Sequence, residues 1–177
     1  MKTRTKNQLT FSGIALAAGI LISSCAGFNF TFTGASLDPA IKTFSIEPFY
    51  NEALDGPANL NVRFTEALKE YYQRNTSLKI AGTSGDLEFA GKIARYGVTP
   101  EAAGGGELQN AQLQRLTVVV NVAFINNIDD EKSFTKDFSF FKQFDADRNL
   151  TDVEDELIEQ IFEQIVFDIF NSTVADW

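Results

Sequence analysis

Residues 151–173, TDVEDELIEQIFEQIVFDIFNST, carry the pattern that decides the fold. Apolar side chains recur here every three or four positions, which is the spacing of one face of an α-helix. The members of this stripe are Val153, Leu157, Ile158, Ile161, Phe162, Ile165, Val166, Ile169 and Phe170. Thr151 and Glu154 predict a capping box at the start of the helix. At 1.5 Å per residue the helix would be roughly 30 Å long, enough to cross a small sheet.

Two stretches before this helix alternate in the way that β-strands do. Residues 113–126 give the clearest pattern, because Leu116, Val118, Val120, Val122 and Phe124 fall on one face. Residues 133–144 follow, with several phenylalanines that include the adjacent Phe140 and Phe141. Neighbouring strand residues point to opposite faces, so these strands are apolar on one face and partly apolar on the other.

The rest of the chain supplies the order of elements. We expect strands over residues 41–50, 78–81 and 86–98, and a helix over 59–75 that Asn59 caps. A change of alternation within 86–98 predicts a β-bulge, and the glycine-rich residues 99–110 are expected to connect a hairpin. The order β-α-β-β-β-β-α predicts an α+β two-layer sandwich. Two helices would pack on one face of a four- to five-stranded mixed or antiparallel sheet.

The N-terminus has the layout of a lipoprotein signal. Lys2, Arg4 and Lys6 precede an apolar run that ends in Ile22-Ser23-Ser24-Cys25. We expect residues 1–24 to be a signal peptide that is cleaved between Ser24 and Cys25, with a diacylglycerol thioether on Cys25. Residues 25–40 would be a lipidated tether and residues 41–177 a single domain. The other interpretation is an ordinary cleaved signal with an incidental cysteine. The tether has no acid before Asp38, so we expect the outer membrane, on the periplasmic side.

Composition excludes several classes of protein. Three of the 15 basic residues lie in the signal, which leaves 12 against 24 acids, a net charge of −12. This balance argues against a nucleic-acid partner. The chain has no histidine and one cysteine, which removes the common nucleophilic triads and zinc sites. Residues 129–131, Asp-Asp-Glu, lack further ligands at loop spacing, so we expect a solvated turn. We therefore expect no enzyme, cofactor or metal.

The second face of the predicted sheet leaves two interpretations open. Val119, Ile125 and Phe141 fall on this face, where no helix is expected. They could be scattered surface side chains of the kind that monomers tolerate. They could instead belong to a surface that a partner covers.

An ordered set of short motifs resembles the lipopolysaccharide-assembly lipoprotein family LptE. The motifs are the Cys25 lipobox, residues 32–36 (FTGAS), 41–46 (IKTFSI), 64–68 (FTEAL), 85–91 (GDLEFAG), 96–100 (YGVTP), 116–122 (LTVVVNV), and the ending from 153–158 (VEDELI) to Trp177. The likeness covers nearly all of the chain after the signal. It implies two helices on a four-stranded sheet, in agreement with the pattern above.

The resemblance also implies a function. Such lipoproteins sit as a plug inside the outer-membrane β-barrel LptD, help that barrel to assemble, and contact lipopolysaccharide in transit. No motif transfers the family's lipopolysaccharide-binding residues to this chain. The available cations are Lys92, Arg95, Arg115, Lys136 and Lys142, and they join Val119, Ile125 and Phe141 as candidate contacts. With a net charge of −12, any contact with an anionic lipid would be local.

A second function stays open at this point. The protein could be a free-standing periplasmic lipoprotein that binds a small apolar or lipid ligand between its helices and its sheet. Co-purification with a large β-barrel would separate the two hypotheses, and an enzyme ranks third behind both.

Overall fold

The computed structural model describes residues 37–101 and 113–175. Predictions about residues 1–36, which include Ser24 and Cys25, therefore lie outside the described residues. The same holds for most of the glycine-rich connection, because residues 102–112 are not described.

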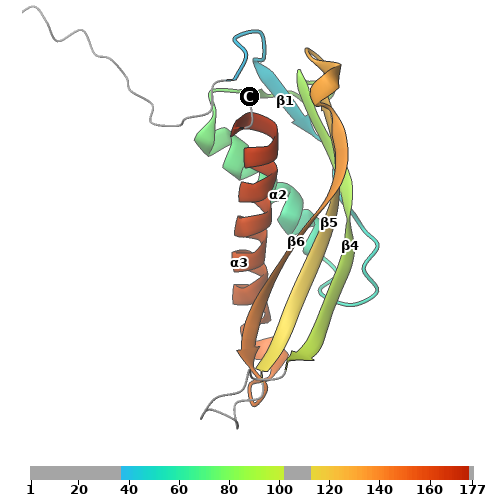
Figure 1. Ribbon diagram of the computed structural model, residues 1–177, viewed down its shortest axis with the longest axis vertical. Coiled ribbons are helices and arrows are strands. Elements are labelled where there is room, and N and C mark those ends of the chain that lie inside the picture. The colour runs from blue at the N-terminus through green and yellow to red at the C-terminus, as the bar shows by residue number, and fades with distance from the viewer. Residues whose placement is uncertain (1–36, 102–112, 176–177) are drawn as a thin grey trace, which may run out of the picture. The chain divides into compact units, whose positions relative to one another are not determined.

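Six strands form one mixed sheet (Figure 1). They are β1 (Thr43–Ile46), β2 (Tyr50–Asn51), β3 (Lys79–Ile80), β4 (Leu87–Glu101), β5 (Leu113–Asn126) and β6 (Phe134–Asp145). The spatial order is β3-β1-β4-β5-β6, and β2 also pairs with β4. Strands β1, β2 and β3 run parallel to their neighbours, whereas β4, β5 and β6 form an antiparallel meander. The predicted α+β class is confirmed, and the element order agrees apart from the division of the first strand, which makes six strands instead of the expected four to five.

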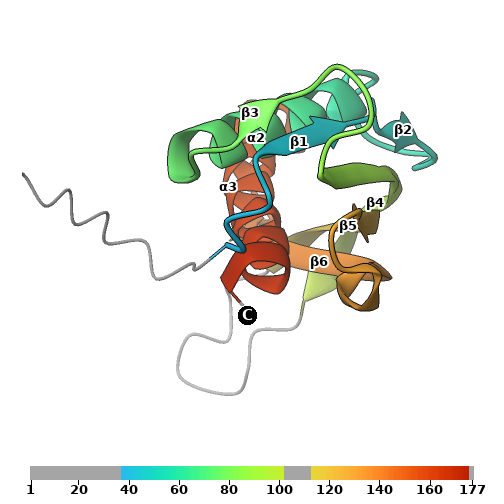
Figure 2. The same ribbon diagram turned by 90° about the horizontal axis from the view of Figure 1, so that it is seen from above.

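Two helices form the second layer, α2 (Leu60–Asn75) and α3 (Leu150–Phe170). Figure 2 shows α2 beside β1 and β3, and the rings of Tyr72 and Phe44, 5.6 Å apart, join these elements. All nine apolar residues of the α3 stripe are buried. The core consists of this stripe, the apolar face of α2 and the inward residues of β4, β5 and β6. Within the described residues, both helices therefore pack on the same face of the sheet.

Strand β5 shows why the antiparallel part was predictable. Its bounds match the expected ones, and from Leu116 to Phe124 buried residues alternate strictly with half-buried ones. The change of alternation in β4 is a true bulge, because the register with β5 shifts between Ile93 and Arg95. Up to Ile93 the odd-numbered residues of β4 point inward, and beyond the shift Tyr96 does so.

Several predicted details are wrong. Asn59 precedes α2 but makes no side-chain cap, and α3 begins one residue before Thr151, so the capping box does not form. The expected strand 41–50 is divided into β1 and β2, because Pro48 has no N–H to continue the ladder. Strand β4 runs on to Glu101, so the connection starts later than expected.

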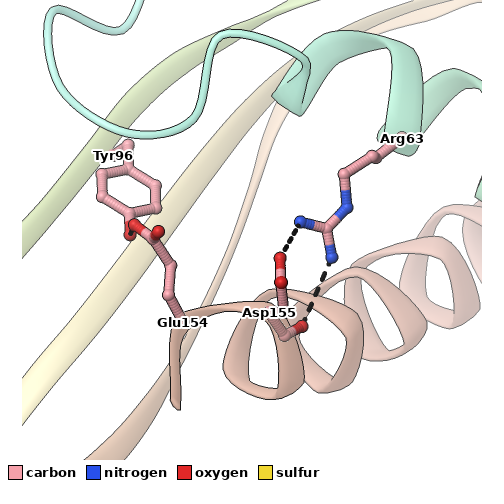
Figure 3. A network of polar contacts seen from close by, with 4 residues as sticks. All are labelled: Arg63, Tyr96, Glu154 and Asp155. Atoms are coloured by element: carbon pink, nitrogen blue, oxygen red, sulfur yellow. Dashed lines mark hydrogen bonds and ion pairs between the residues drawn. The ribbon is translucent and has the colours of Figure 1, made fainter. Parts of the chain in front are cut away.

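Polar contacts tie the start of α3 to the rest of the fold (Figure 3). The Tyr96 hydroxyl donates to the Glu154 carboxylate at 2.5 Å, and Arg63 Nη1 lies 2.7 Å from Asp155 Oδ1. Burial, reinforced by the bond to Glu154, raises the pKa of the Tyr96 hydroxyl above its ordinary value. These contacts join β4 and α2 to the first turns of α3.

A carboxylate fastens β1 beside β4. Asp86 Oδ2 accepts hydrogen bonds from Lys42 N, Thr43 N and Thr43 Oγ1 at 2.8–2.9 Å. These bonds, led by that of the Lys42 backbone, hold the pKa of Asp86 below its usual 3.8. The Asp86 carboxylate therefore fixes the place where the parallel pairing of β1 with β4 begins.

Candidate interaction surface

The sheet face opposite the helices can be assigned from the strand register. We call it the open face, and its residues on β4, β5 and β6 follow. They are Glu88, Ala90, Lys92, Arg95, Gly97, Thr99, Glu101, Leu113, Arg115, Thr117, Val119, Asn121, Ala123, Ile125, Thr135, Asp137, Ser139, Phe141, Gln143 and Asp145. All three apolar candidates, Val119, Ile125 and Phe141, lie on this face, and Ile125 and Phe141 are 45% and 41% exposed.

Cross-strand rows on the open face differ in character. One row consists of Ala90, Ala123 and Thr135, which are short and uncharged. The row of Lys92, Asn121 and Asp137 carries charge, but Asn121 donates to Asp137 at 2.6 Å and Lys92 pairs with Glu52 at 2.8 Å. The open face therefore combines short side chains with several polar groups that already have partners within the chain.

Arg115 is held at one end of the open face. Its guanidinium forms an ion pair with Glu101 and lies 4.0 Å from the centre of the Phe141 ring. Gln143 Nε2 donates to the same carboxylate at 2.6 Å. The bond from Gln143, followed by that from Arg115, lowers the pKa of Glu101. Arg115 is thus oriented by three side chains and is already paired with an anion.

The five candidate cations do not form one patch. Lys92, Arg95 and Arg115 lie on the open face, whereas Lys136 and Lys142 pair with Val122 and Leu116 and so lie on the helix side. Arg95 is exposed and makes no ion pair among the described residues. Of the three cations on the open face, it is the one available to an external anion.

The grooves described by the structure open onto the surface. One groove of about 490 Å³ lies between α2 and α3, and Arg63, Glu66, Glu70, Arg74 and Glu159 contribute charges to its lining. The helix–sheet interface, where the second hypothesis placed an apolar ligand, holds buried side chains such as Phe64, Ile161 and Ile165. The structure thus offers that ligand an open groove between the helices, lined by both charged and apolar side chains.

Sequence reasoning missed the carboxylates that hold the cations. Glu52 pairs with Lys92 from outside the three long strands, and Glu101, which also accepts from Gln143, pairs with Arg115 from the neighbouring strand. The alternation of β4, β5 and β6 places Glu101 and Gln143 on the open face once the register is known. No group of three or more acidic, histidine or cysteine residues in the described part could hold a metal ion.

The sequence matches the family described as "LptE: Lipopolysaccharide-assembly" over residues 41–173. The chain belongs to the LptE family. This match covers both helices and all six strands, and it confirms the resemblance drawn from the short motifs. Proteins of the LptE family are lipoproteins of lipopolysaccharide assembly that are associated with the outer membrane. No helix within residues 37–101 and 113–175 is long and apolar enough to span a membrane.

Solved lipoprotein structures are similar to this chain at low identity. Lipoprotein B from Nitrosomonas europaea is 14% identical, with a TM-score of 0.50, over 84% of this chain and 91% of that one. A minor lipoprotein from Acinetobacter baumannii (12%, TM-score 0.48) aligns over 75% and 94% of the two chains. The rare lipoprotein B from Shewanella oneidensis (11%, TM-score 0.45) aligns over 74% and 90%. A search of the curated proteins finds no match.

Proposed function

We propose that this LptE-family protein is a lipid-anchored plug and assembly partner of the lipopolysaccharide-transport barrel LptD. Membership of the family supports the role in lipopolysaccharide assembly. The observation that carries the proposal is the open face, a sheet surface over which the described part of the chain places no helix. In a plug, this face lies against the barrel wall.

The chemistry of the open face suits burial against another protein. Burying an unpaired charge is costly, and Lys92, Arg115 and Asp137 already have partners in this chain. The row of Ala90, Ala123 and Thr135 presents short side chains, which allow close approach of a partner surface. Phe141, oriented by Arg115, supplies an aromatic anchor of the kind that dominates interface energies.

We further propose that the anchor is a lipid on Cys25, after cleavage at Ser24. A single acyl chain holds a protein only marginally, whereas two or more give stable attachment. Residues 25–40 then form the tether and residues 41–177 the domain, on the periplasmic side of the outer membrane. Cys25→Ser is expected to leave an unprocessed or soluble protein. Normal membrane fractionation of this variant would contradict the anchor without affecting the plug assignment.

Contact with lipopolysaccharide is proposed at Arg95. It is the exposed cation of the open face without an ion pair among the described residues. Arg95→Glu is expected to weaken lipopolysaccharide binding, while Lys79→Glu, the same charge change on β3, leaves it unchanged. Unaltered binding by the Arg95 variant would remove this residue from the path.

The partnership is tested by extraction of the outer membrane in mild detergent. A tagged wild-type chain should co-purify with a large β-barrel at fixed stoichiometry. Ile125→Asp combined with Phe141→Asp should reduce that yield at least about tenfold, because each change buries a charge in the contact. Val62→Asp is the control, since Val62 is 58% exposed on α2. Recovery of the wild-type chain alone would refute the plug and favour a free-standing lipoprotein.

A further inference from the structure

Strand β6 ends the sheet and leaves one backbone edge without a strand partner among the described residues. It pairs with β5 along its full length of 12 residues, without a register shift. It contains no proline, the residue that most directly prevents edge pairing. At about 3.3 Å per residue this edge is roughly 40 Å long. Figure 1 shows β6 at the margin of the meander, next to β5.

A groove runs beside this edge, between β6 and α3. It has a volume of about 400 Å³, and Phe140 and Lys142 of β6 face Gln164 and Phe167 of α3 across it. The Phe167 side chain is 44% exposed although it is aromatic. An edge strand flanked by a helix is an arrangement in which added strands bind. Backbone hydrogen bonds then give affinity, and alternate side chains enter the groove.

Two lysines mark the same strand. Lys136 Nζ lies 5.0 Å from the Phe138 ring centre and Lys142 Nζ lies 5.7 Å from that of Phe140. Neither lysine makes an ion pair among the described residues, although acids outnumber bases in the chain by 24 to 15. Glu163 also lines the groove but does not pair with Lys142. The helix side of β6 thus carries Lys136, Phe138, Phe140 and Lys142 at alternate positions, of which Phe138 is buried in the core and the other three remain accessible.

We propose that the free edge of β6 binds an extended acidic segment of a partner protein as an additional strand. Residues opposite one another in paired strands share a face, so the partner must offer an apolar side chain to Phe140 and carboxylates to Lys136 and Lys142. The pattern acid-x-apolar-x-apolar-x-acid meets this requirement in both parallel and antiparallel addition, because one of its two apolar residues lies opposite Phe140 in either direction.

A second copy of this chain is the other occupant to consider. Two antiparallel overlaps of β6 with itself are equally long, with the two-fold axis at Ser139 or at Phe140. The first sets Lys136 opposite Lys142, and like charges directly opposite each other destabilise a strand pair. The second sets each lysine opposite a phenylalanine, so neither overlap offers a carboxylate to a lysine, whereas an acidic strand offers one to both. This site lies away from the open face, and its proposal does not depend on the barrel partnership.

The test uses the full-length chain in detergent micelles and a fluorescent peptide, acetyl-Thr-Glu-Thr-Val-Thr-Val-Thr-Glu-Thr-amide, in an anisotropy titration. Two further peptides carry N-methyl groups, one on the Glu and Val amides and the other on the inner Thr amides. Alternate amides of a strand point to opposite edges, so one methylated series should lose binding at least about tenfold and the other should keep it. Equal effects in both series would mean that the backbone does not pair, and would overturn the proposal.

Charge exchange tests the side-chain part. Lys136→Glu combined with Lys142→Glu should weaken binding about tenfold, as expected for two surface ion pairs. A peptide with lysines in place of both glutamates should restore it, which also shows that the variant is folded. Lys79→Glu on β3, the opposite edge strand, is the matched control and should bind normally. Failure of the restoring peptide would overturn the charge assignment, and so would concentration-dependent dimers that the double variant abolishes.

Discussion

The buried contact between Tyr72 and Thr173 allows a sharp prediction about how α2 is fastened to the end of the chain. The side chains of both residues are buried, at 0% and 1% exposure. The Thr173 hydroxyl proton is directed to the carbonyl oxygens of Ile169 at 2.9 Å and Phe170 at 3.2 Å. The Tyr72 hydroxyl, which hydrogen-bonds to Thr173, is therefore the donor in that contact. Burial raises the pKa of Tyr72, which keeps this donor protonated.

The two single substitutions should differ in cost. Tyr72→Phe removes one hydrogen bond and leaves Thr173 with its carbonyl partners, so it should cost about 0.5–1.5 kcal/mol. Thr173→Val keeps the shape but leaves the Tyr72 hydroxyl buried without an acceptor, so it should cost about 2–3 kcal/mol. In the double variant no group is left without a partner. Its stability should therefore approach that of Tyr72→Phe alone.

The measurement is urea unfolding of the full-length chain in detergent, followed by far-ultraviolet circular dichroism. The double-mutant cycle should give a coupling of about 2–3 kcal/mol, the cost of Thr173→Val alone, with the Thr173 variant as the less stable single. Additive effects would refute the reasoning. So would a Thr173→Val variant as stable as Tyr72→Phe, because the buried hydroxyl would then have another acceptor.

Three further predictions concern packing and pH. Ile165→Ala should lower the free energy of unfolding by about 2–5 kcal/mol, because Ile165 is fully buried. Phe167→Ala, at a 44% exposed position, should lower it by less than about 1 kcal/mol. Equal unfolding midpoints of the two variants would contradict this. Gly91→Ala should cost about 1–3 kcal/mol or prevent folding, since its Cβ would lie 2.1 Å from the Asn121 carbonyl oxygen, while Gly97→Ala meets nothing within 4 Å and should be neutral in thermal unfolding. The lowered pKa of Asp86 makes its carboxylate stabilising above pH 3.8, and this contribution is lost as the pH falls through the folded-state value. Asp86→Ala should therefore cost about 1–2 kcal/mol at neutral pH, discounted for exposure, and less in acid; a constant difference across the titration would contradict the charge effect.

Much of the fold could be predicted because strong periodic signals coincide with burial. The bounds of β5 were predicted from its alternation, and the apolar stripe of α3 gave its whole buried face. The bulge near Ile93 was also visible, since one extra residue reverses the alternation. These signals are local, and each depends on which side chains must leave water.

The starts of the helices and the division between β1 and β2 were harder to predict from the sequence. A cap depends on backbone angles at one residue, and Thr151 proved to lie inside the helix. The placement of β3 at the sheet edge depends on two residues that pair with β1, too few to give an alternation. The candidate cations were identified by type, but their sorting between two faces required the register.

The contact that fixes the candidate surface was the least predictable. Arg115, Glu101 and Phe141 come from three strands, and the register of these strands brings them together. The contact of Tyr96 with Glu154 joins residues 58 positions apart. No local pattern encodes such distances, so the sequence could name the residues without pairing them.

Strand β1 pairs with β4, which lies much later in the chain. Thr43 and Asp86, which begin its pairing with β4, are separated by 43 residues, whereas β4, β5, β6 and α3 follow one another with shorter closures. Contacts between distant segments are slow to form, so the meander and α3 should assemble first and the β1–α2 segment should dock onto them. During synthesis, which begins at the N-terminus, β1 and α2 therefore lack their packing partners until β4 has been made. A chaperone that binds unfolded segments would act on them in that interval.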